Sequence, residues 1–288
     1  MPKFSFLIAN FNNGKFFSDC YKSIIAQTIQ DWEVIILDDF STDNSIEIIS
    51  NLIENDARFK IYRNDQNRGI GFTKRKLIEY ANSEICGFLD PDDALENNAI
   101  EIITKAHFEN PHIGLIYSNF TYCDEFLNKQ TVHKTKQINA LDESYYNFKG
   151  EISSFATFKK SIYQKTTGID PFLKIAEDKD WYMKMCEVAP VLHIDKSLYL
   201  YRVHDGGISS SQNAEKAAFW HWIAMMKMSE RTGASIDEIF LEQYTRKSYF
   251  DYEKKLNEQH LRFRNKIKKS KWLKLGHFLG LFKNYNEL

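Results

Sequence analysis

The chain has 288 residues, of which 43% are hydrophobic, and a formal net charge of −1 at pH 7. This length and apolar fraction suffice for one large α/β domain, or for one domain with an extension. A charge so close to zero argues against a general nucleic-acid-binding protein, because such proteins carry basic patches that meet phosphates. Twelve glycines and five prolines are too few for long disordered linkers.

The sequence also indicates the compartment. The cysteines are far apart, form no CxxC pair, and are expected to be reduced core residues: Cys20, Cys86, Cys123 and Cys186. The first residues lead directly into an apolar segment and lack the pattern of a signal peptide. No apolar run is long enough to cross a bilayer. We therefore expect a cytoplasmic protein.

Strands and helices alternate in the first third of the sequence. Continuous apolar runs predict four strands, at Phe4–Ala9, Trp32–Leu37, Phe59–Tyr62 and Ile85–Leu89. Helical spacing predicts three helices between them, at Lys15–Ala26, Ile46–Ile53 and Thr73–Ala81. Strands joined by such helices form right-handed crossovers. We therefore predict an α/β fold with a mostly parallel sheet whose two faces are covered by helices.

The rest of the chain is less regular. We predict a helix over Ala94–Phe108 with Asp93 as its cap, and a strand over Ile113–Ser118. Tyr122–Ile138 favours a hairpin or a loop. The pattern then predicts three short strands and one helix, in the order Phe155–Lys159, Asp178–Val188 (the helix), Val191–Ile194 and Leu198–Arg202. It is helical from Asn213 onward, so we expect a domain over residues 1–211 and a helical extension over 212–288.

Acidic residues follow two of the predicted strands. Asp38 and Asp39 end the second strand, and Asp90, Asp92 and Asp93 follow the fourth. Carboxylates this close together raise each other's pKa, and a divalent cation relieves the repulsion because it prefers oxygen ligands. Ligands of open α/β sheets bind at the carboxyl ends of the strands, so we expect one shared site. Without a GxGxxG or Walker A sequence, phosphates would be held through a metal and basic side chains.

Several motifs occur in a fixed order from the start to about Ser211. They are Ile8-Ala9-Asn10-Phe11-Asn12, Ser23-Ile24-Ile25-Ala26-Gln27-Thr28, Glu33–Ser45, Asn67-Arg68-Gly69 with Lys74-Arg75, Phe88–Asp93, Gly168-Ile169-Asp170, Glu177-Asp178-Lys179-Asp180-Trp181, and Tyr201–His204 followed by Ile208-Ser209. Together they resemble the motifs of glycosyltransferase family 2, whose members have the GT-A fold. The resemblance implies an inverting, metal-dependent enzyme. It would move a sugar from a UDP-sugar to a hydroxyl of a glycan or lipid-linked acceptor, as in the synthesis of cell-surface polysaccharide.

The resemblance also implies a nucleotide site. Asp39 would accept a hydrogen bond from the uracil N3–H, and the backbone near Ala9 and the ring of Phe11 would meet the base. Asp90 would bind the ribose or a metal-bound water. Basic residues near the nucleotide would be Arg68 and Arg75.

The remaining roles concern the metal and catalysis. Asp92 would ligate Mn²⁺ or Mg²⁺, and His204 would be a ligand of the metal or of the diphosphate. Asp178 would be the general base that takes the proton of the acceptor hydroxyl, and Glu177 would orient the acceptor. The alternative for both acids is a structural role at a helix N-terminus, which the helix dipole favours.

The C-terminal segment Arg262–Lys283 is basic and has aromatic residues interleaved. It resembles an interfacial anchor, which would place the protein peripherally on the inner face of the membrane. A solvated helix or a contact in a homo-oligomer fits the pattern equally well.

Two other functions compete with that of a glycosyltransferase. A sugar nucleotidyltransferase needs a glycine-rich N-terminal loop, which this chain lacks. A catalytically silent subunit that binds nucleotide-sugar is disfavoured because Asp39, Asp92 and Asp178 are all present.

Overall fold

The computed structural model describes residues 2–54, 56–138, 151–204, 214–241 and 247–279. The chain divides into two compact units, residues 1–231 and 232–288. The predicted division after residue 211 lies outside the described residues and stays a prediction.

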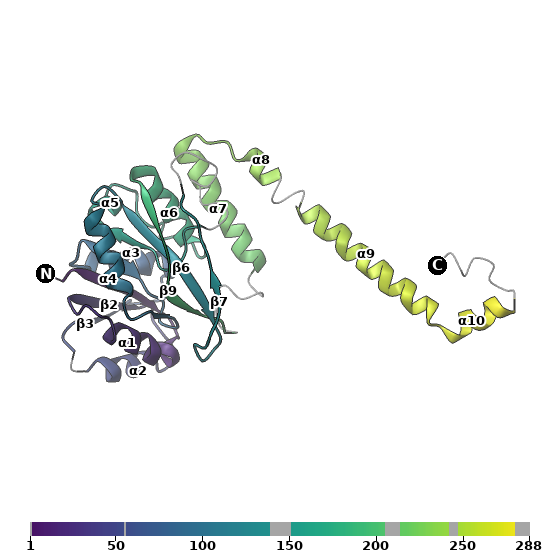
Figure 1. Ribbon diagram of the computed structural model, residues 1–288, viewed down its shortest axis with the longest axis horizontal. Helices are drawn as coiled ribbons and strands as arrows, with labels where there is room; N and C mark the ends of the chain where they lie inside the picture. Colours follow the sequence, from purple (N-terminus) through teal and green to yellow (C-terminus); the bar gives the residue numbers. More distant parts are fainter. Residues whose placement is uncertain (1, 55, 139–150, 205–213, 242–246, 280–288) are drawn as a thin grey trace. The chain divides into compact units, whose positions relative to one another are not determined.

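Four parallel strands form the first half of the sheet in the first unit, in the order β3-β2-β1-β4. Figure 1 labels β2 and β3 of this half. These strands are β1 (Phe4–Asn10), β2 (Trp32–Asp38), β3 (Phe59–Arg63) and β4 (Ile85–Phe88). The helices that join them are α1 (Phe17–Ile25), preceded by the 3₁₀ turn η1 (Gly14–Phe16), α2 (Ser45–Ile53) and α3 (Ile70–Tyr80). The predicted alternation of strands and helices is confirmed.

The second half of the sheet is mixed. It contains β5 (Ala94–Leu95), β6 (Leu115–Cys123), β7 (Lys129–His133), β8 (Thr157–Lys159) and β9 (Val191–Arg202). Strand β8 is antiparallel to both β4 and β6, and β6 is parallel to β9. Strand β5 pairs antiparallel with β9, and β7 pairs antiparallel with β6. Because β7 returns along β6, the hairpin alternative for this segment is confirmed.

Two predictions for this half were wrong. The helix expected from Ala94 is α4 and begins at Ala99 (Ala99–Glu109), because Ala94 and Leu95 pair with β9 instead. Asp93 is therefore no helix cap. The two short strands expected between Val191 and Arg202 are one strand, which stays paired with β6 through an irregular register.

Helices cover both faces of the sheet, as predicted. One core cluster joins the sheet to α1, α2 and α4, and the other joins it to α3, to α5 (Lys160–Tyr163) and to α6 (Glu177–Val188). Trp181 of α6 is 1% exposed, and its ring centroid lies 5.9 Å from that of Phe88 and 5.0 Å from that of Phe158. This packing holds the start of α6 near the end of β4. All four cysteines are free and buried, as expected.

Helix α7 (Ala214–Thr232) is joined to α6 by ion pairs. Arg231 lies 3.0 Å from Asp180 and 2.9 Å from Glu187. Asp180 also pairs with Lys184 at 2.6 Å. Since Asp180 is fully buried between two cations, it fastens the two helices together.

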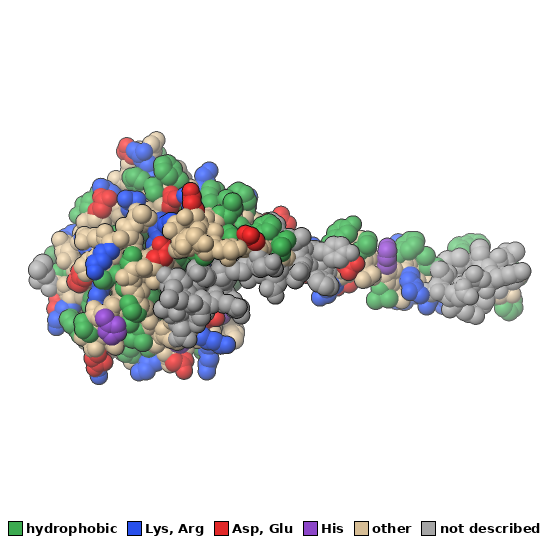
Figure 2. Space-filling model, turned by 90° about the horizontal axis from the view of Figure 1, so that it is seen from above, with side chains coloured by type: hydrophobic (Ala, Val, Ile, Leu, Met, Phe, Trp, Pro, Cys, Tyr) green, Lys and Arg blue, Asp and Glu red, His purple; other side chains and the backbone are tan. Residues whose placement is uncertain are grey.

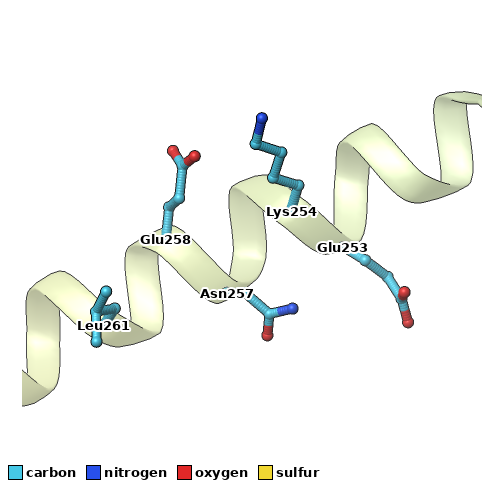
Figure 3. Close-up of a pocket in the computed structure, with 5 residues that line it drawn as sticks. All are labelled: Glu253, Lys254, Asn257, Glu258 and Leu261. Carbon is cyan, nitrogen blue, oxygen red and sulfur yellow. The ribbon is translucent and has the colours of Figure 1, made fainter.

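The second unit consists of α8 (Asp237–Phe240), α9 (Lys247–Lys268) and α10 (Lys271–Phe278). Figure 2 shows hydrophobic and basic side chains exposed along it. A surface hollow on α9 is lined by Glu253, Lys254, Asn257, Glu258 and Leu261 (Figure 3). All five residues come from one helix, so the hollow is not an enclosed ligand site. Within the described segments, no helix combines the length and the hydropathy needed to cross a bilayer.

Candidate functional site

The carboxyl end of β2 carries the first acidic pair. Asp38 is fully buried and accepts hydrogen bonds from Asn10 Nδ2 (2.8 Å) and from the backbone N–H and the hydroxyl of Ser41. Arg63 Nε lies 3.3 Å from the same carboxylate. Asp38 therefore holds the ends of β1, β2 and β3 together.

Asp39 fixes the loop that leads into α3. Its Oδ1 accepts hydrogen bonds from Asn64 Nδ2 and from the backbone N–H of Arg68, both at 2.8 Å. Its Oδ2 accepts one from the backbone N–H of Gly69 at 2.7 Å. Gly69 has a positive φ of 86°, which glycine adopts without the strain a side chain would cause. Asp39 thus shapes the rim of the predicted nucleotide site, and its backbone N–H donates to the carbonyl of Asn10, which precedes the half-exposed Phe11.

The second acidic cluster follows β4. Burial raises the pKa of Asp90, and Asp92 and Asp178 raise it further, while Lys74 acts in the opposite direction. In the described part of the chain, no group donates a hydrogen bond to the Asp90 carboxylate. Asp92 and Asp178 therefore add negative charge around Asp90, which Lys74 offsets in part and which suits a cation or a polar substrate.

Asp93 has a different role from its neighbours. Its carboxylate accepts hydrogen bonds from the Tyr199 hydroxyl and the Arg202 backbone N–H, each at 2.7 Å. The Tyr199 hydroxyl in turn accepts a hydrogen bond from the backbone N–H of Asp90 at 3.3 Å. Burial raises the pKa of Asp93, and the carboxylates of Asp92 and Asp90 raise it further. Asp93 thus ties the acidic loop to β9.

Arg202 is a buried cation beside this loop. Its Nε donates to the carbonyl of Asp92 at 2.6 Å, and its Nη2 lies 2.8 Å from Asp19 of α1. Its guanidinium lies 4.7 Å from the ring centroid of Phe16. Arg202 fixes the backbone of Asp92, and the ring of Phe16 also contacts that of His204, with the two centroids 4.6 Å apart.

Asp92 and His204 lie together. His204 Nε2 is 2.9 Å from Asp92 Oδ2, and the Asp92 side chain is 18% exposed. Among the described residues, no three His, Cys, Asp or Glu side chains group closely enough to hold a metal ion. Asp92 nevertheless fits Mg²⁺ or Mn²⁺, because such ions commonly bind one or two carboxylates and complete their shell with phosphate oxygens and waters.

The start of α6 brings two further acids to this edge. Glu177 is 5% exposed, and its Oε1 lies 2.8 Å from Lys74 Nζ. Burial raises the pKa of Glu177, and Asp178 raises it further, whereas Lys74 lowers it. Asp178 is only partly buried. The preceding residue, Ala176, has a left-handed backbone with φ 61°.

The structure gives the predicted basic residues other partners. The Arg68 guanidinium lies 3.1 Å from Asp65, and Arg75 donates to the carbonyls of Thr167 and Ile169. Both arginines are exposed and remain predictions as nucleotide ligands. Sequence reasoning overlooked Lys74, although a lysine where the family motif has a small residue was a visible signal.

A family model described as "Glycosyl transferase family 2" matches residues 5–167. A chondroitin synthase of Pasteurella multocida (strain Pm70) is 26% identical over 242 residues, which make up 82% of this chain and 24% of that protein. A GalNAc(5)-diNAcBac-PP-undecaprenol beta-1,3-glucosyltransferase of Campylobacter jejuni is 28% identical over 207 residues, or 70% of this chain and 63% of that protein. The chain thus spans about a quarter of the synthase and most of the glucosyltransferase.

Solved structures show the same fold. TarS 1–349 of S. aureus in complex with UDP has a TM-score of 0.61 and 19% identity, covering 78% of this chain and 65% of that one. The mannosyltransferase PcManGT of Pyrobaculum calidifontis, in complex with GDP-Man and Mn²⁺, has a TM-score of 0.63 and 14% identity, covering 99% of this chain and 82% of that one. The predicted GT-A architecture is therefore confirmed.

Proposed function

The chain belongs to glycosyl transferase family 2, and we propose that it moves a sugar from a UDP-sugar to a hydroxyl of a glycan or lipid-linked acceptor, with inversion at the anomeric carbon. One observation carries the proposal. Acids from distant parts of the sequence lie at one edge of the sheet: Asp90 and Asp92 follow β4, and Asp178 is in the first turn of α6, whose Trp181 packs against Phe88 at the end of β4. This edge is where ligands of α/β sheets bind.

For the donor, we propose that Asp39 binds the uracil, that the backbone near Ala9 and the ring of Phe11 contact the base, and that Asp90 binds the ribose or a metal-bound water. Phe11 is 47% exposed beside the end of β1, so its ring is available for stacking. The UDP in the TarS complex supports this choice of nucleotide, whereas the GDP-Man in PcManGT makes it worth testing.

For the metal, we propose that Asp92 and His204 would hold Mn²⁺ or Mg²⁺. When bound, such a cation supplies positive charge that stabilises the departing diphosphate. The Mn²⁺ in PcManGT supports the choice of cation. Arg202 fixes the backbone of Asp92, and the Phe16 ring packs against that of His204.

For the chemistry, we propose that Asp178 takes the proton of the acceptor hydroxyl. The acceptor oxygen then forms a bond to the anomeric carbon from the side opposite the nucleotide. The bond between that carbon and the phosphate oxygen breaks, and its electron pair leaves with UDP. Glu177 orients the acceptor. Positioning of the two substrates reduces the entropic cost of bringing them together.

For the acceptor, we propose a lipid-linked glycan reached through peripheral contact of the C-terminal segment with a membrane. Trp272 and Phe278 of α10 are 80% and 85% exposed, and Lys271 and Lys274 lie on the same short helix. Exposed aromatic and basic residues on one helix are typical of interfacial binding. The Campylobacter relative is named for an acceptor on an undecaprenol diphosphate, which supports this acceptor class.

A screen of donors tests the proposal. The full chain is incubated with UDP-, GDP- and dTDP-sugars and Mn²⁺, and nucleotide release is measured with and without candidate acceptors. We expect release from a UDP-sugar that increases with acceptor, and calorimetry should show Mn²⁺-dependent binding of UDP. UDP binding without release from any donor would instead indicate a silent binding subunit.

A further inference from the structure

Lys74 is a buried cation at the meeting point of the candidate donor and acceptor sides. Its side chain, on α3, is 11% exposed, and its Nζ lies 2.8 Å from Glu177 Oε1. The same Nζ lies 5.4 Å from the ring centroid of Phe88, the last residue of β4. Burying an ammonium group is costly unless it is paired, so a lysine at this position needs the acids around it.

Carboxylates from two separate segments face this lysine. Glu177 and Asp178 come from α6, and Asp90 comes from the loop after β4. The Tyr182 phenol of α6 also interacts with it. Burial opposes the charged form of Lys74, but the three carboxylates more than offset this and hold its pKa above the ordinary value of lysine. Lys74 is therefore charged at neutral pH.

The first turn of α6 needs this support. Ala176, which precedes the helix, has a left-handed backbone and provides no side-chain cap. Such a conformation is unfavourable for a residue with a side chain. Another interaction must therefore fix the direction of the first turn. The bond from Lys74 to Glu177 joins residues 103 positions apart and fixes that turn against α3.

We propose that Lys74 is a positioning residue for sugar transfer: its ammonium fixes Glu177, and with it the first turn of α6 that carries Asp178, against the loop that carries Asp90. This inference rests on the proposed function and deepens it. Lys74 would not react itself. It keeps the base and the donor-side acid at the separation that transfer requires.

The test replaces Lys74 with methionine, which keeps the length of the side chain and removes the charge. We expect kcat to fall by about 10²-fold, as small misplacements in an active site do, with little change in donor KM. The acidic limb of the pH–rate profile should also move to higher pH. Lys74 lowers the pKa of Glu177, so without it Glu177 stays protonated up to a higher pH and the active carboxylate form appears later.

A matched control lies two residues away on the same helix. Lys76 pairs with Glu79 at 2.6 Å, but its side chain is 37% exposed, so Lys76→Met should leave kcat within about twofold of the wild type and the pH–rate profile unchanged. Lys74→Arg keeps the charge, so the acidic limb of its pH–rate profile should coincide with that of the wild type. All rates are measured well below the unfolding temperature of each variant. If Lys74→Met does not fold, Lys74→Gln should show the same shift.

The outcomes separate the two proposals. If the wild type is active and Lys74→Met matches Lys76→Met in kcat and pH profile, the role of Lys74 is overturned and the proposed function is not. A loss of rate without any shift of the acidic limb also overturns it, because it would indicate a merely structural contact. A wild type that releases nucleotide from no sugar donor overturns the proposed function itself.

Discussion

Two acidic clusters follow parallel strands of the same sheet, yet their surroundings differ. After β2, Asp38 and Asp39 accept hydrogen bonds from backbone N–H groups and from side chains of neighbouring loops. After β4, the described residues give the Asp90 carboxylate no such donor, and Asp92 pairs with His204. The first cluster is held by fixed donors that also order the loops, whereas the Asp90 carboxylate of the second accepts no hydrogen bond from the described residues.

This contrast shows what an acidic motif means in a structure. The oxygens of Asp38 and Asp39 are neutralised by fixed donors, so their charge contributes to the fold. Asp90 is raised in pKa by burial and by Asp92 and Asp178. Charge that is both concentrated and lacking donors favours a bound cation or a proton-transfer role. The predictions below test whether the two clusters differ in this way.

The largest effect is expected from Asp178, in the first turn of α6. Asp178→Asn keeps the shape of the side chain but cannot accept the proton of the acceptor. Transfer should fall by about 10²–10⁴-fold, while UDP binding stays unchanged. Nucleotide release with saturating acceptor and calorimetry with UDP measure the two effects, with Glu79→Gln on the exposed face of α3 as control. Retained turnover would remove Asp178 from the role of base.

Asp92→Ala should have the next largest effect. The variant loses one of the two proposed metal ligands, so Mn²⁺-dependent UDP binding should weaken by about 10²-fold, or about 2.7 kcal/mol. Calorimetry with UDP, with and without Mn²⁺, measures the change. Chelation by EDTA should bring the wild type to the level of the variant. If the Mn²⁺-dependent affinity does not change, the second cluster does not bind the metal through Asp92.

Much of this could be predicted from the sequence. The parallel strands β1 to β4 were clear because long apolar runs alternate with helical spacing, and local patterns of this kind need no knowledge of distant contacts. The acids at the strand ends were clear for the same reason. The single strand β9 and the late start of α4 were not clear, because both depend on pairing between residues 76 to 106 positions apart.

The candidate site was less predictable than the fold. Sequence patterns identified Asp92, Asp178 and His204 as candidates, but they could not show which acids accept hydrogen bonds from neighbouring groups. Lys74 was overlooked because its importance comes from burial against Glu177, and a run of three basic residues on a helix usually indicates a solvated face. The burial of a side chain and its pairing with a residue far along the chain are tertiary properties, which no local sequence pattern contains.

A smaller effect is expected from Asp39, in the cluster that holds loops. Asp39→Asn replaces one acceptor oxygen with an NH₂ group, so the backbone N–H of either Arg68, which bonds to Oδ1, or Gly69, which bonds to Oδ2, loses its acceptor. The free energy of unfolding should fall by about 1–3 kcal/mol, and UDP affinity should fall with it. Urea titration measures the first and calorimetry the second. Asp65→Asn, at an exposed position beside Arg68, should change stability by less than about 0.5 kcal/mol. Equal stability of the two variants would contradict the structural role of Asp39.

The smallest effect on catalysis is expected from the second unit, because both acidic clusters lie in the first. Truncation after Asn257 removes the end of α9 and all of α10, so transfer to a water-soluble acceptor should stay within about twofold of the full chain. Binding to anionic vesicles should be lost, because each basic residue near such a surface contributes about 1 kcal/mol. Sedimentation with phosphatidylserine vesicles measures the binding, and in the full chain it should weaken as salt screens the charges. A full-length protein that never sediments with these vesicles would leave the basic segment without a membrane role, and the same truncation would then test for a change in oligomeric state.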